Sequence, residues 1–386
     1  MSAGLMDQPA GQISIGVILG GFAGGGAQRD AVLLSNALAR TGAKVTVMVL
    51  RSQGPLSCLL DKGIPVVELA PRIRMSVHRL RRVFLDARFD IVLSSEASLN
   101  IACVLAVRLL PRSDRPGLIL REVGVPSVGI KHDPYVQNRL AYRMARLYRH
   151  ADHVVTLTEG ARRDLIDLFG VPAAMISVLR TKPIITPAVA ASLRAHASQS
   201  AREAGLIVAM GRLSAEKGYR DLIRAMAFVP RDVAWRLLLV GEGRERARLE
   251  RLATRLGLDD RIAFAGYARD PFPWFQRAEI AVSCSLYEGF GNSLVEALAC
   301  GTQVVATDCP YGPREILDYG RFGRLVPTRD PRDLAAAISG EFGREVDRNA
   351  LMERGLEHRT DRAAAEFLSI ARHIRASVRH LSLATP

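Results

Sequence analysis

Short apolar runs alternate with helix-like segments along this chain, and the alternation occurs twice. The first series of apolar runs lies at residues 13–19, 45–50, 65–69, 91–94, 118–120 and 154–157. The second series lies at residues 206–210, 235–240, 262–264, 280–282 and 303–306. Strands that alternate with helices form a parallel sheet whose two faces are covered by those helices. The pattern therefore predicts an α/β protein with two similar halves.

A polar, proline-containing stretch separates the two series. Prolines occur twice within residues 182–187, and an alanine-rich polar segment follows to residue 200. A chain of 386 residues is also long for a single hydrophobic core. We therefore predict a first domain at residues 1–190, a second at residues 191–360 and a final helical segment at residues 361–386.

The composition limits where such a chain works. Hydrophobic residues make up 48% of the sequence and the mean hydropathy is +0.10, as expected for a well-buried globular protein. The five cysteines show no paired or metal-binding spacing, which favours reduced thiols in the cytoplasm. The N-terminus lacks the pattern of a secretory signal, and no apolar run approaches the ~20 residues that span a bilayer. We expect a cytoplasmic protein that associates peripherally with the inner face of the plasma membrane.

The segment from Glu288 to Glu296 carries the strongest functional signal. It follows one apolar run and leads into another, which predicts a strand, a glycine-bearing turn and a helix capped by Asn292 or Ser293. Backbone N–H groups at such a helix start favour a phosphate. Carboxylates accept hydrogen bonds from hydroxyl groups, so the two glutamates predict a sugar on each side of that phosphate.

A basic loop upstream fits the same ligand. The apolar run 206–210 is followed by the loop 211–218, which contains Arg212 and Lys217. An arginine fork and a lysine point charge can together neutralise the charge that develops on a leaving nucleoside diphosphate. Cations that are held in place beforehand stabilise the transition state more than the ground state. By itself the loop is compatible with a diphosphate site and equally with a solvated basic loop.

These two segments resemble motifs of a known family. Residues 285–308 resemble the donor-binding motif of family 4 glycosyltransferases, and the loop 211–218 resembles the diphosphate-binding loop of that family. The resemblance implies the GT-B fold, in which two Rossmann-like domains face each other across a cleft and a C-terminal helix crosses back. It implies that residues 1–190 bind the acceptor, that residues 191–360 bind the nucleotide-sugar donor, and that residues 361–386 pack on the first domain. The implied reaction is a metal-independent sugar transfer with retention of anomeric configuration.

The resemblance also assigns roles to individual residues. Arg212, Lys217 and Glu288 are the implied catalytic residues, with the two cations on the diphosphate and Glu288 on hydroxyls of the transferred sugar. Glu296 is implied to bind the ribose hydroxyls, and Tyr267 lies in the loop that meets the nucleobase. The implied donor-binding residues are Gly25, Gly26, Gly211, Tyr267, Gly289, Phe290, Gly291, Asn292, Ser293, Leu294 and Glu296.

The first half departs from the family pattern at one position. Arg121 and Glu122 lie at a strand end where many relatives continue with a histidine, but Val123 follows here. We expect Arg121 and Glu122 near the acceptor or the transferred sugar. Because the first half offers no nucleophile beyond the candidate Glu122, we expect front-face substitution in which the leaving phosphate helps to deprotonate the incoming hydroxyl. The chain has no Asp-x-Asp motif, so we expect neither a metal ion nor a cofactor to be required.

The charge of the chain suggests a further partner. The formal net charge is +14, and basic clusters occur at residues 72–82 and 139–149. The second cluster predicts a helix with Arg139, Arg143 and Arg146 on one face, which can lie on an anionic membrane. The expected partners are a UDP- or GDP-sugar donor, a glycan or lipid-linked acceptor and an anionic membrane surface, without nucleic acid.

Two other functions could use the same features. A non-hydrolysing nucleotide-sugar epimerase shares the GT-B architecture and acts without an acceptor. A basic nucleic-acid-binding protein would use the arginine clusters and leave Glu288 and Glu296 without a purpose. The sequence does not separate UDP from GDP and does not identify the acceptor. Its charge and the family resemblance favour cell-envelope polysaccharide or lipopolysaccharide synthesis.

Overall fold

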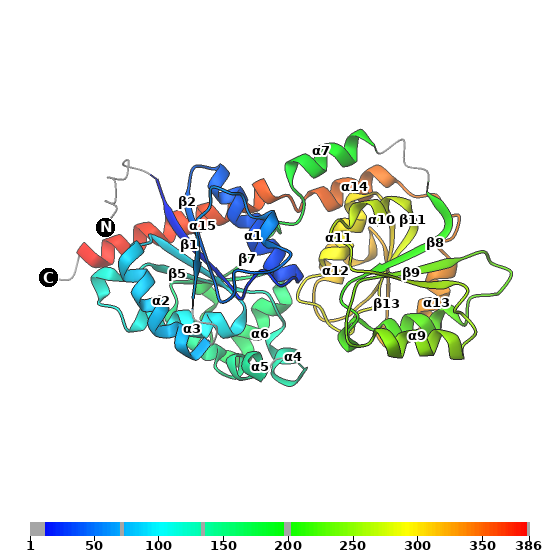
Figure 1. Ribbon diagram of the computed structural model, residues 1–386, viewed down its shortest axis with the longest axis horizontal. Helices are drawn as coiled ribbons and strands as arrows, with labels where there is room; N and C mark the ends of the chain where they lie inside the picture. The colour runs from blue at the N-terminus through cyan, green and yellow to red at the C-terminus, as the bar shows by residue number, and fades with distance from the viewer. Residues whose placement is uncertain (1–11, 70–72, 133–135, 197–201, 384–386) are drawn as a thin grey trace. The chain divides into compact units, whose positions relative to one another are not determined.

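The computed structural model describes residues 12–69, 73–132, 136–196 and 202–383 (Figure 1). The chain divides into two compact units, one formed by residues 1–183 with 360–386 and the other by residues 184–359. Each unit contains one fully parallel sheet with helices on both faces, which confirms the predicted α/β architecture.

The boundary between the units lies earlier than the predicted position at residue 190. Helix α7 (Pro187–Ala195) begins just after the division, with the Thr186 hydroxyl accepting the Val189 N–H as its N-cap. The guanidinium of Arg194 near its end forms a two-oxygen contact with the Glu353 carboxylate, at 2.7 and 2.8 Å. These contacts join α7 to the second unit, so residues 187–195 of the predicted boundary segment form a helix of that unit.

The first unit contains a seven-stranded sheet in the order β3-β2-β1-β4-β5-β6-β7. Its strands are β1 (Ser14–Leu19), β2 (Lys44–Val49), β3 (Val66–Glu68), β4 (Ile91–Ser95), β5 (Gly117–Glu122), β6 (His153–Thr156) and β7 (Ile176–Val178). Its helices are α1 (Gly26–Arg40), α2 (Ile73–Ala87), α3 (Ala97–Arg108), α4 (Pro126–His132), α5 (Val136–Arg143), α6 (Glu159–Phe169) and α15 (Thr360–Leu383). The strand order reverses between β1 and β4, and such a switch point is where ligands bind in open α/β sheets.

Each face of this sheet carries its own hydrophobic core. Successive strand residues point to opposite faces, so Val17 joins the core under α1 and α15, whereas Ile18 joins the core under α2, α3 and α5. Phe367 and Ala371 of α15 are buried in the former core, and α15 packs against α1. The expectation that the C-terminal helix returns to the first domain is therefore confirmed.

The second unit contains a six-stranded sheet in the order β10-β9-β8-β11-β12-β13. Its strands are β8 (Glu203–Met210), β9 (Arg236–Val240), β10 (Ile262–Gly266), β11 (Ala278–Ser283), β12 (Gln303–Thr307) and β13 (Arg324–Val326). Its helices besides α7 are α8 (Tyr219–Met226), α9 (Arg246–Arg255), α10 (Phe272–Arg277), α11 (Asn292–Ala299), α12 (Pro313–Ile316), α13 (Pro331–Ser339) and α14 (Arg348–Leu356). The switch point here lies between β8 and β11.

The basic segment 139–149 does not form the continuous helix that its pattern predicted. Helix α5 ends at Arg143, and a 3₁₀ helix, η3 (Ala145–His150), follows. Ala145 and Tyr148 of η3 are fully buried, so the chain changes its helical period to place them in the core. Arg146 consequently does not continue the α-helical face of Arg139. In the other basic cluster, position 72 lies outside the described residues.

Candidate active site

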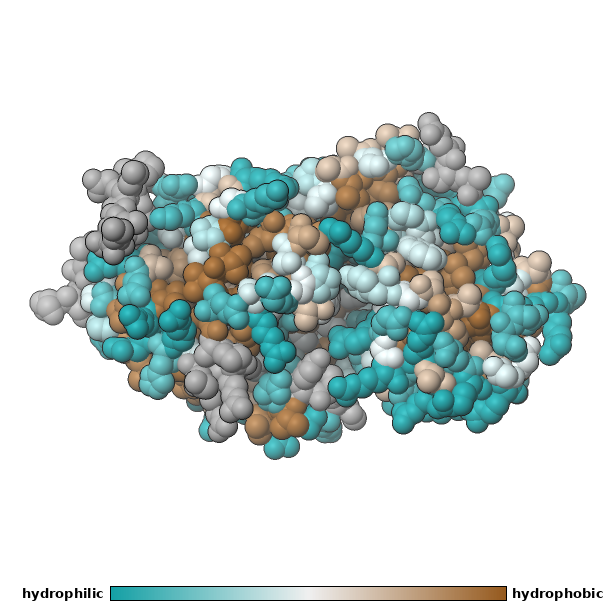
Figure 2. Space-filling model, viewed as in Figure 1, coloured by the Kyte–Doolittle hydropathy of each residue, from teal (hydrophilic) through white to brown (hydrophobic). Residues whose placement is uncertain are grey.

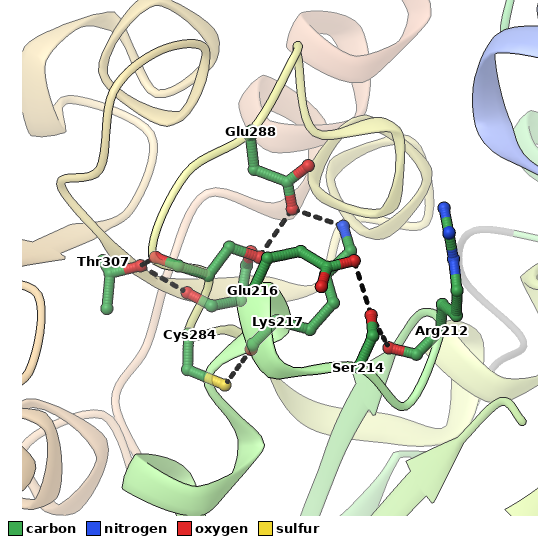
Figure 3. Close-up of polar contacts among 9 residues, drawn as sticks. Arg212, Ser214, Glu216, Lys217, Cys284, Glu288 and Thr307 are labelled. Atoms are coloured by element: carbon green, nitrogen blue, oxygen red, sulfur yellow. Dashed lines mark hydrogen bonds and ion pairs between the residues drawn. The ribbon is translucent and has the colours of Figure 1, made fainter. Parts of the chain in front are cut away.

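The loops that follow β8 and β11 bring together an acidic and a basic side chain at the switch point of the second unit. The Lys217 Nζ atom lies 2.6 Å from Oε1 of Glu288 (Figure 3). The hydroxyl of Ser285 donates to the same carboxylate oxygen at 2.6 Å. Both members of the ion pair are partly exposed, at 22% for Lys217 and 10% for Glu288, so a ligand could reach them. Two of the three predicted catalytic residues, Lys217 and Glu288, are thus neighbours.

The two loops are fixed to each other through their backbones. Gly218 has a φ of 66°, and a Cβ atom placed on it would lie 1.9 Å from the carbonyl oxygen of Cys284. The Cys284 thiol donates to the carbonyl oxygen of Lys217 at 3.1 Å, and the Leu286 N–H donates to that of Glu216 at 2.8 Å. Glycine is required at position 218 because it combines a left-handed backbone with this close approach.

The loop after β12 holds Glu288 from its other side. The Glu288 N–H donates to the carbonyl oxygen of Pro310 at 2.9 Å, and the Tyr311 N–H donates to that of Glu288 at 3.2 Å. The Thr307 hydroxyl, at the end of β12, donates to the carbonyl oxygen of Ser285 at 2.5 Å. Three strand ends, those of β8, β11 and β12, therefore fix the position of the Glu288 carboxylate.

The turn after Glu288 leads directly into α11. Gly291, with a φ of 117°, occupies the N-cap position, so the sequence-based choice of Asn292 or Ser293 as the cap is wrong by one or two residues. Within the described residues, no side-chain hydrogen bond caps this helix. The residues 289–294 that were expected to bind phosphate and sugar therefore form the start of a helix, where backbone N–H groups and the helix dipole favour an anion.

The remaining predicted donor residues of this unit have different settings. Glu296 lies on α11 with only 6% of its surface exposed. Gly211 and Arg212 follow β8, and the exposed Arg212 side chain stands apart from the Lys217–Glu288 pair in Figure 3. Tyr267 follows β10 and is 59% exposed.

The predicted residues of the first unit lie at the start of one helix and at the end of one strand. Gly25 precedes α1 with a φ of 136°, and Gly26 begins that helix. Arg121 and Glu122, at the end of β5, are 1% and 0% exposed. Nη2 of Arg121 lies 3.5 Å from Oδ2 of Asp30. The burial of Arg121 and Glu122 gives no support to the expectation that they contact a sugar directly.

Glu122 belongs to a buried polar network. The Tyr148 hydroxyl donates to Glu122 Oε2 at 2.8 Å, and the Asn100 amide lies 3.1 Å from the same hydroxyl. Burial, and then the nearby Glu122 carboxylate, raises the pKa of Tyr148 well above its ordinary value. Burial lowers the pKa of Arg121, and Asp30 opposes that change. These groups fix the end of β5 from within the unit.

Some contributors to the site were not identified from the sequence. Ser285, Cys284 and Thr307 touch Glu288 or the loops that carry it, as described above. Ser285 and Thr307 lie within the stretch 285–308 that resembles the family's donor-binding motif, but no individual role was assigned to them. The other signal is position, since Cys284 and Ser285 directly follow one strand and Thr307 ends the next. A polar side chain at a strand end is common, and only the sheet order reveals that these two ends are adjacent.

Comparison with known proteins identifies the family. Residues 24–181 match the model described as Glycosyltransferase Family 4, and residues 204–340 match the model described as Glycosyl transferases group 1. The chain belongs to the family 4 glycosyltransferases. The lipopolysaccharide core biosynthesis glycosyltransferase LpsE of Rhizobium meliloti is 29% identical over 353 residues, which cover 86% of this chain and 90% of that protein. The lipopolysaccharide 1,6-galactosyltransferase of Escherichia coli is 24% identical over 68% of this chain and 67% of its own length.

Solved structures of other glycosyltransferases have the same fold as this glycosyltransferase. A glycosyltransferase from Rickettsia africae superposes with a TM-score of 0.74 at 18% identity, covering 94% of this chain and 99% of its own. HepE of Anabaena, solved in complex with UDP-glucose, superposes with a TM-score of 0.69 at 20% identity, covering 96% of this chain and 100% of its own. The glycosyltransferase therefore has the GT-B fold, as expected. No helix within the described ranges is long and apolar enough to cross a membrane.

Proposed function

We propose that this glycosyltransferase transfers a sugar from a nucleoside-diphosphate sugar to a hydroxyl group of a lipid-linked glycan in cell-envelope polysaccharide or lipopolysaccharide synthesis. The observation that carries the proposal is the Lys217–Glu288 pair at the β8–β11 switch point, beside the start of α11. The similarity of this chain to LpsE supports a lipopolysaccharide acceptor. The UDP-glucose bound by HepE makes a UDP-sugar the donor to test first.

Each group at the site has a distinct role in this proposal. Lys217 contacts the diphosphate, and Glu288 accepts hydrogen bonds from hydroxyl groups of the transferred sugar. The Lys217 ammonium group lies 2.6 Å from the Glu288 carboxylate, which neutralises its charge. A bound diphosphate competes for the ammonium group and leaves the carboxylate to the sugar. Arg212 and the N–H groups at the start of α11 share the remaining negative charge.

The proposed reaction is front-face substitution with retention. The bond between the anomeric carbon and the diphosphate oxygen breaks, and its electron pair stays on the diphosphate. The acceptor oxygen bonds to the same face of that carbon and loses its proton to a leaving phosphate oxygen. Lys217 and Arg212 offset the charge that develops on the diphosphate, so no metal ion is needed in this scheme.

The membrane partner is proposed from the surface of α5. Val136, Leu140 and Met144 at this helix are 56%, 53% and 39% exposed, and Arg139 and Arg143 lie between them. Figure 2 shows hydrophobic surface at the edge of the first unit near α5. Apolar residues that enter an interface beside cations favour an anionic membrane.

Binding to phosphatidylglycerol vesicles but not to phosphatidylcholine vesicles is expected, and replacement of Leu140 and Met144 by serine should weaken it. Leu168→Ser is the matched control, because Leu168 is 58% exposed on α6 of the same unit. Equal binding by both variants, or no binding to anionic vesicles at low salt, contradicts this partner.

The donor is tested by thermal shift with UDP, GDP and ADP in the presence of EDTA. A ligand at 100 times its Kd adds about 2.7 kcal/mol to the free energy of unfolding. We expect a raised Tm with UDP and transfer from a UDP-sugar to the truncated glycolipid extracted from a deletion strain of the source organism. NMR of the product should show the anomeric configuration of the donor. A shift with GDP alone would reassign the donor, whereas activity that EDTA abolishes or an inverted product would contradict the proposed mechanism.

A further inference from the structure

The switch point of the first unit carries a second carboxylate that the sequence did not single out. Gly20 directly follows β1, and Glu96 directly follows β4, the neighbouring strand in the sheet. Oε1 of Glu96 accepts the Gly20 N–H at 2.9 Å and lies 3.5 Å from Nε2 of Gln28. A Cβ atom on Gly20 would lie 2.9 Å from Oε2 of Glu96, so the carboxylate faces this glycine with both oxygens.

One carboxylate therefore bonds to both ends of the β1–α1 loop. The loop runs from Gly20 to Gly26, and Gln28 lies in the first turn of α1. Five of the seven loop residues are glycines, namely Gly20, Gly21, Gly24, Gly25 and Gly26. A chain so rich in glycine loses much conformational freedom when it is ordered, so a single loop shape needs external contacts. The Glu96 carboxylate supplies such contacts at the two ends.

The backbone of Glu96 is itself strained. Its φ is 98° and its ψ is 130°, although it carries a side chain. It precedes α3, yet its side chain does not cap that helix. A non-glycine residue in this region is costly and persists only where its surroundings enforce it, and such strain gathers at functional sites. Glycine would adopt this backbone conformation without strain. The presence of glutamate at this position therefore points to a role for its side chain.

We propose that Glu96 is a positioning residue that holds the β1–α1 loop in the shape that binds the acceptor during sugar transfer. The family resemblance implied donor binding for Gly25 and Gly26 of this loop. We assign the loop to the acceptor instead, because the proposed diphosphate and donor-sugar groups, Lys217 and Glu288, both lie in the second unit. Ligands of open α/β sheets bind at the switch point, where Glu96 and Gly20 lie. The effect on transfer rests on the proposed function, whereas the effect on the loop does not.

Three variants separate positioning from general stability. Glu96→Gly removes the carboxylate and relieves the strain, so its Tm should not fall while its kcat/KM for the truncated glycolipid falls at least tenfold. Glu96→Gln keeps an oxygen that accepts the Gly20 N–H and should retain most of the activity. Arg88→Gly is the matched control, because Arg88 also has a positive φ, of 45°, on an exposed position of the same unit. It should raise the Tm without changing kcat/KM.

Hydrogen exchange tests the loop independently of activity. In Glu96→Gly the Gly20 amide should exchange faster than in the wild type and in Arg88→Gly, while the Tm shift caused by UDP stays unchanged. Wild-type exchange at Gly20 in Glu96→Gly overturns the positioning role. Faster exchange with unchanged kcat/KM overturns the link to acceptor binding. A wild-type protein that transfers no sugar would instead count against the proposed function, and the exchange data would still decide the contact.

Discussion

Lys217 and Glu288 are 71 positions apart in the sequence, yet their Nζ and Oε1 atoms lie 2.6 Å apart. Each residue belongs to a loop at the carboxyl end of a strand, and the two strands, β8 and β11, are neighbours at the switch point. In the proposed function, this pair places a cation for the diphosphate beside a carboxylate for a sugar hydroxyl.

Removal of the Lys217 ammonium should lower the rate of transfer strongly. Lys217→Ala is expected to reduce kcat by ~10²–10³, because the charge on the leaving diphosphate loses a preorganised cation. Steady-state kinetics with the UDP-sugar donor measures the loss. Lys62→Ala serves as the control, since Lys62 is an exposed lysine of the first unit and has no role in the proposed site. A rate in Lys217→Ala equal to that of the control would remove Lys217 from the mechanism.

Substitution of Gly218 by alanine should be destabilising for two reasons, its left-handed backbone and its close approach to a carbonyl oxygen. Gly170 shares only the left-handed backbone. Gly218 and Gly170 have φ values of 66° and 63°, but an added Cβ meets the Cys284 carbonyl oxygen only at Gly218. Gly170→Ala should cost about 1–2 kcal/mol, as a left-handed alanine does. Gly218→Ala should cost clearly more and should also reduce activity, because the β8 and β11 loops must separate. Urea unfolding and transfer rates compare the two, and equal losses of stability would show that the close approach is unimportant.

Removal of only one partner of the buried Asp30–Arg121 ion pair should destabilise the protein. Their side chains are 3% and 1% exposed, and two guanidinium nitrogens of Arg121 have no hydrogen-bond partner among the described residues. Asp30→Asn should cost about 3–5 kcal/mol, because it leaves an uncompensated charge inside the unit. The double variant Asp30→Leu/Arg121→Met should recover most of that loss. Urea unfolding of the three proteins measures this, and a double variant less stable than Asp30→Asn contradicts the argument.

The stability of the first unit should fall as His153 becomes protonated. Burial, and then the nearby His373, lowers the pKa of His153 below its ordinary value of 6.5, and its Nε2 lies 2.8 Å from the Ser177 hydroxyl. The folded state therefore binds a proton less readily than the unfolded state. The stabilisation from a neutral His153 is complete above the unfolded pKa and is lost as the pH falls through the lower folded pKa.

Melting temperatures between about pH 7.5 and about pH 5.5 test this sign. The Tm of the wild type should fall across this range, and His153→Gln should show a smaller fall because its side chain does not titrate. An identical pH dependence in both proteins would assign the effect to other groups.

Much of the fold follows from local patterns in the sequence. Strand-length apolar runs separated by helical segments predicted two parallel sheets, and β1, β8 and β11 lie within a residue or a few of the predicted runs. The short edge strands β7 and β13 were missed, because a run of three residues gives too little periodicity. The predicted helix through residues 139–149 failed since burial of Tyr148 overrides local helical preference.

The sequence alone determined the family of this protein, because the Glu288–Glu296 turn and the basic loop at Lys217 are contiguous segments that resemble the family's motifs. The chemistry of these segments also predicted the class of ligand. Only the tertiary structure decided which groups meet. The strand order placed Lys217 against Glu288 and Glu96 against Gly20, and it enclosed Arg121 and Glu122, which the sequence had suggested for substrate contact. Such contacts depend on which strands are neighbours and on which side chains the core covers. Both are properties of long-range packing, and no local pattern of residues records them.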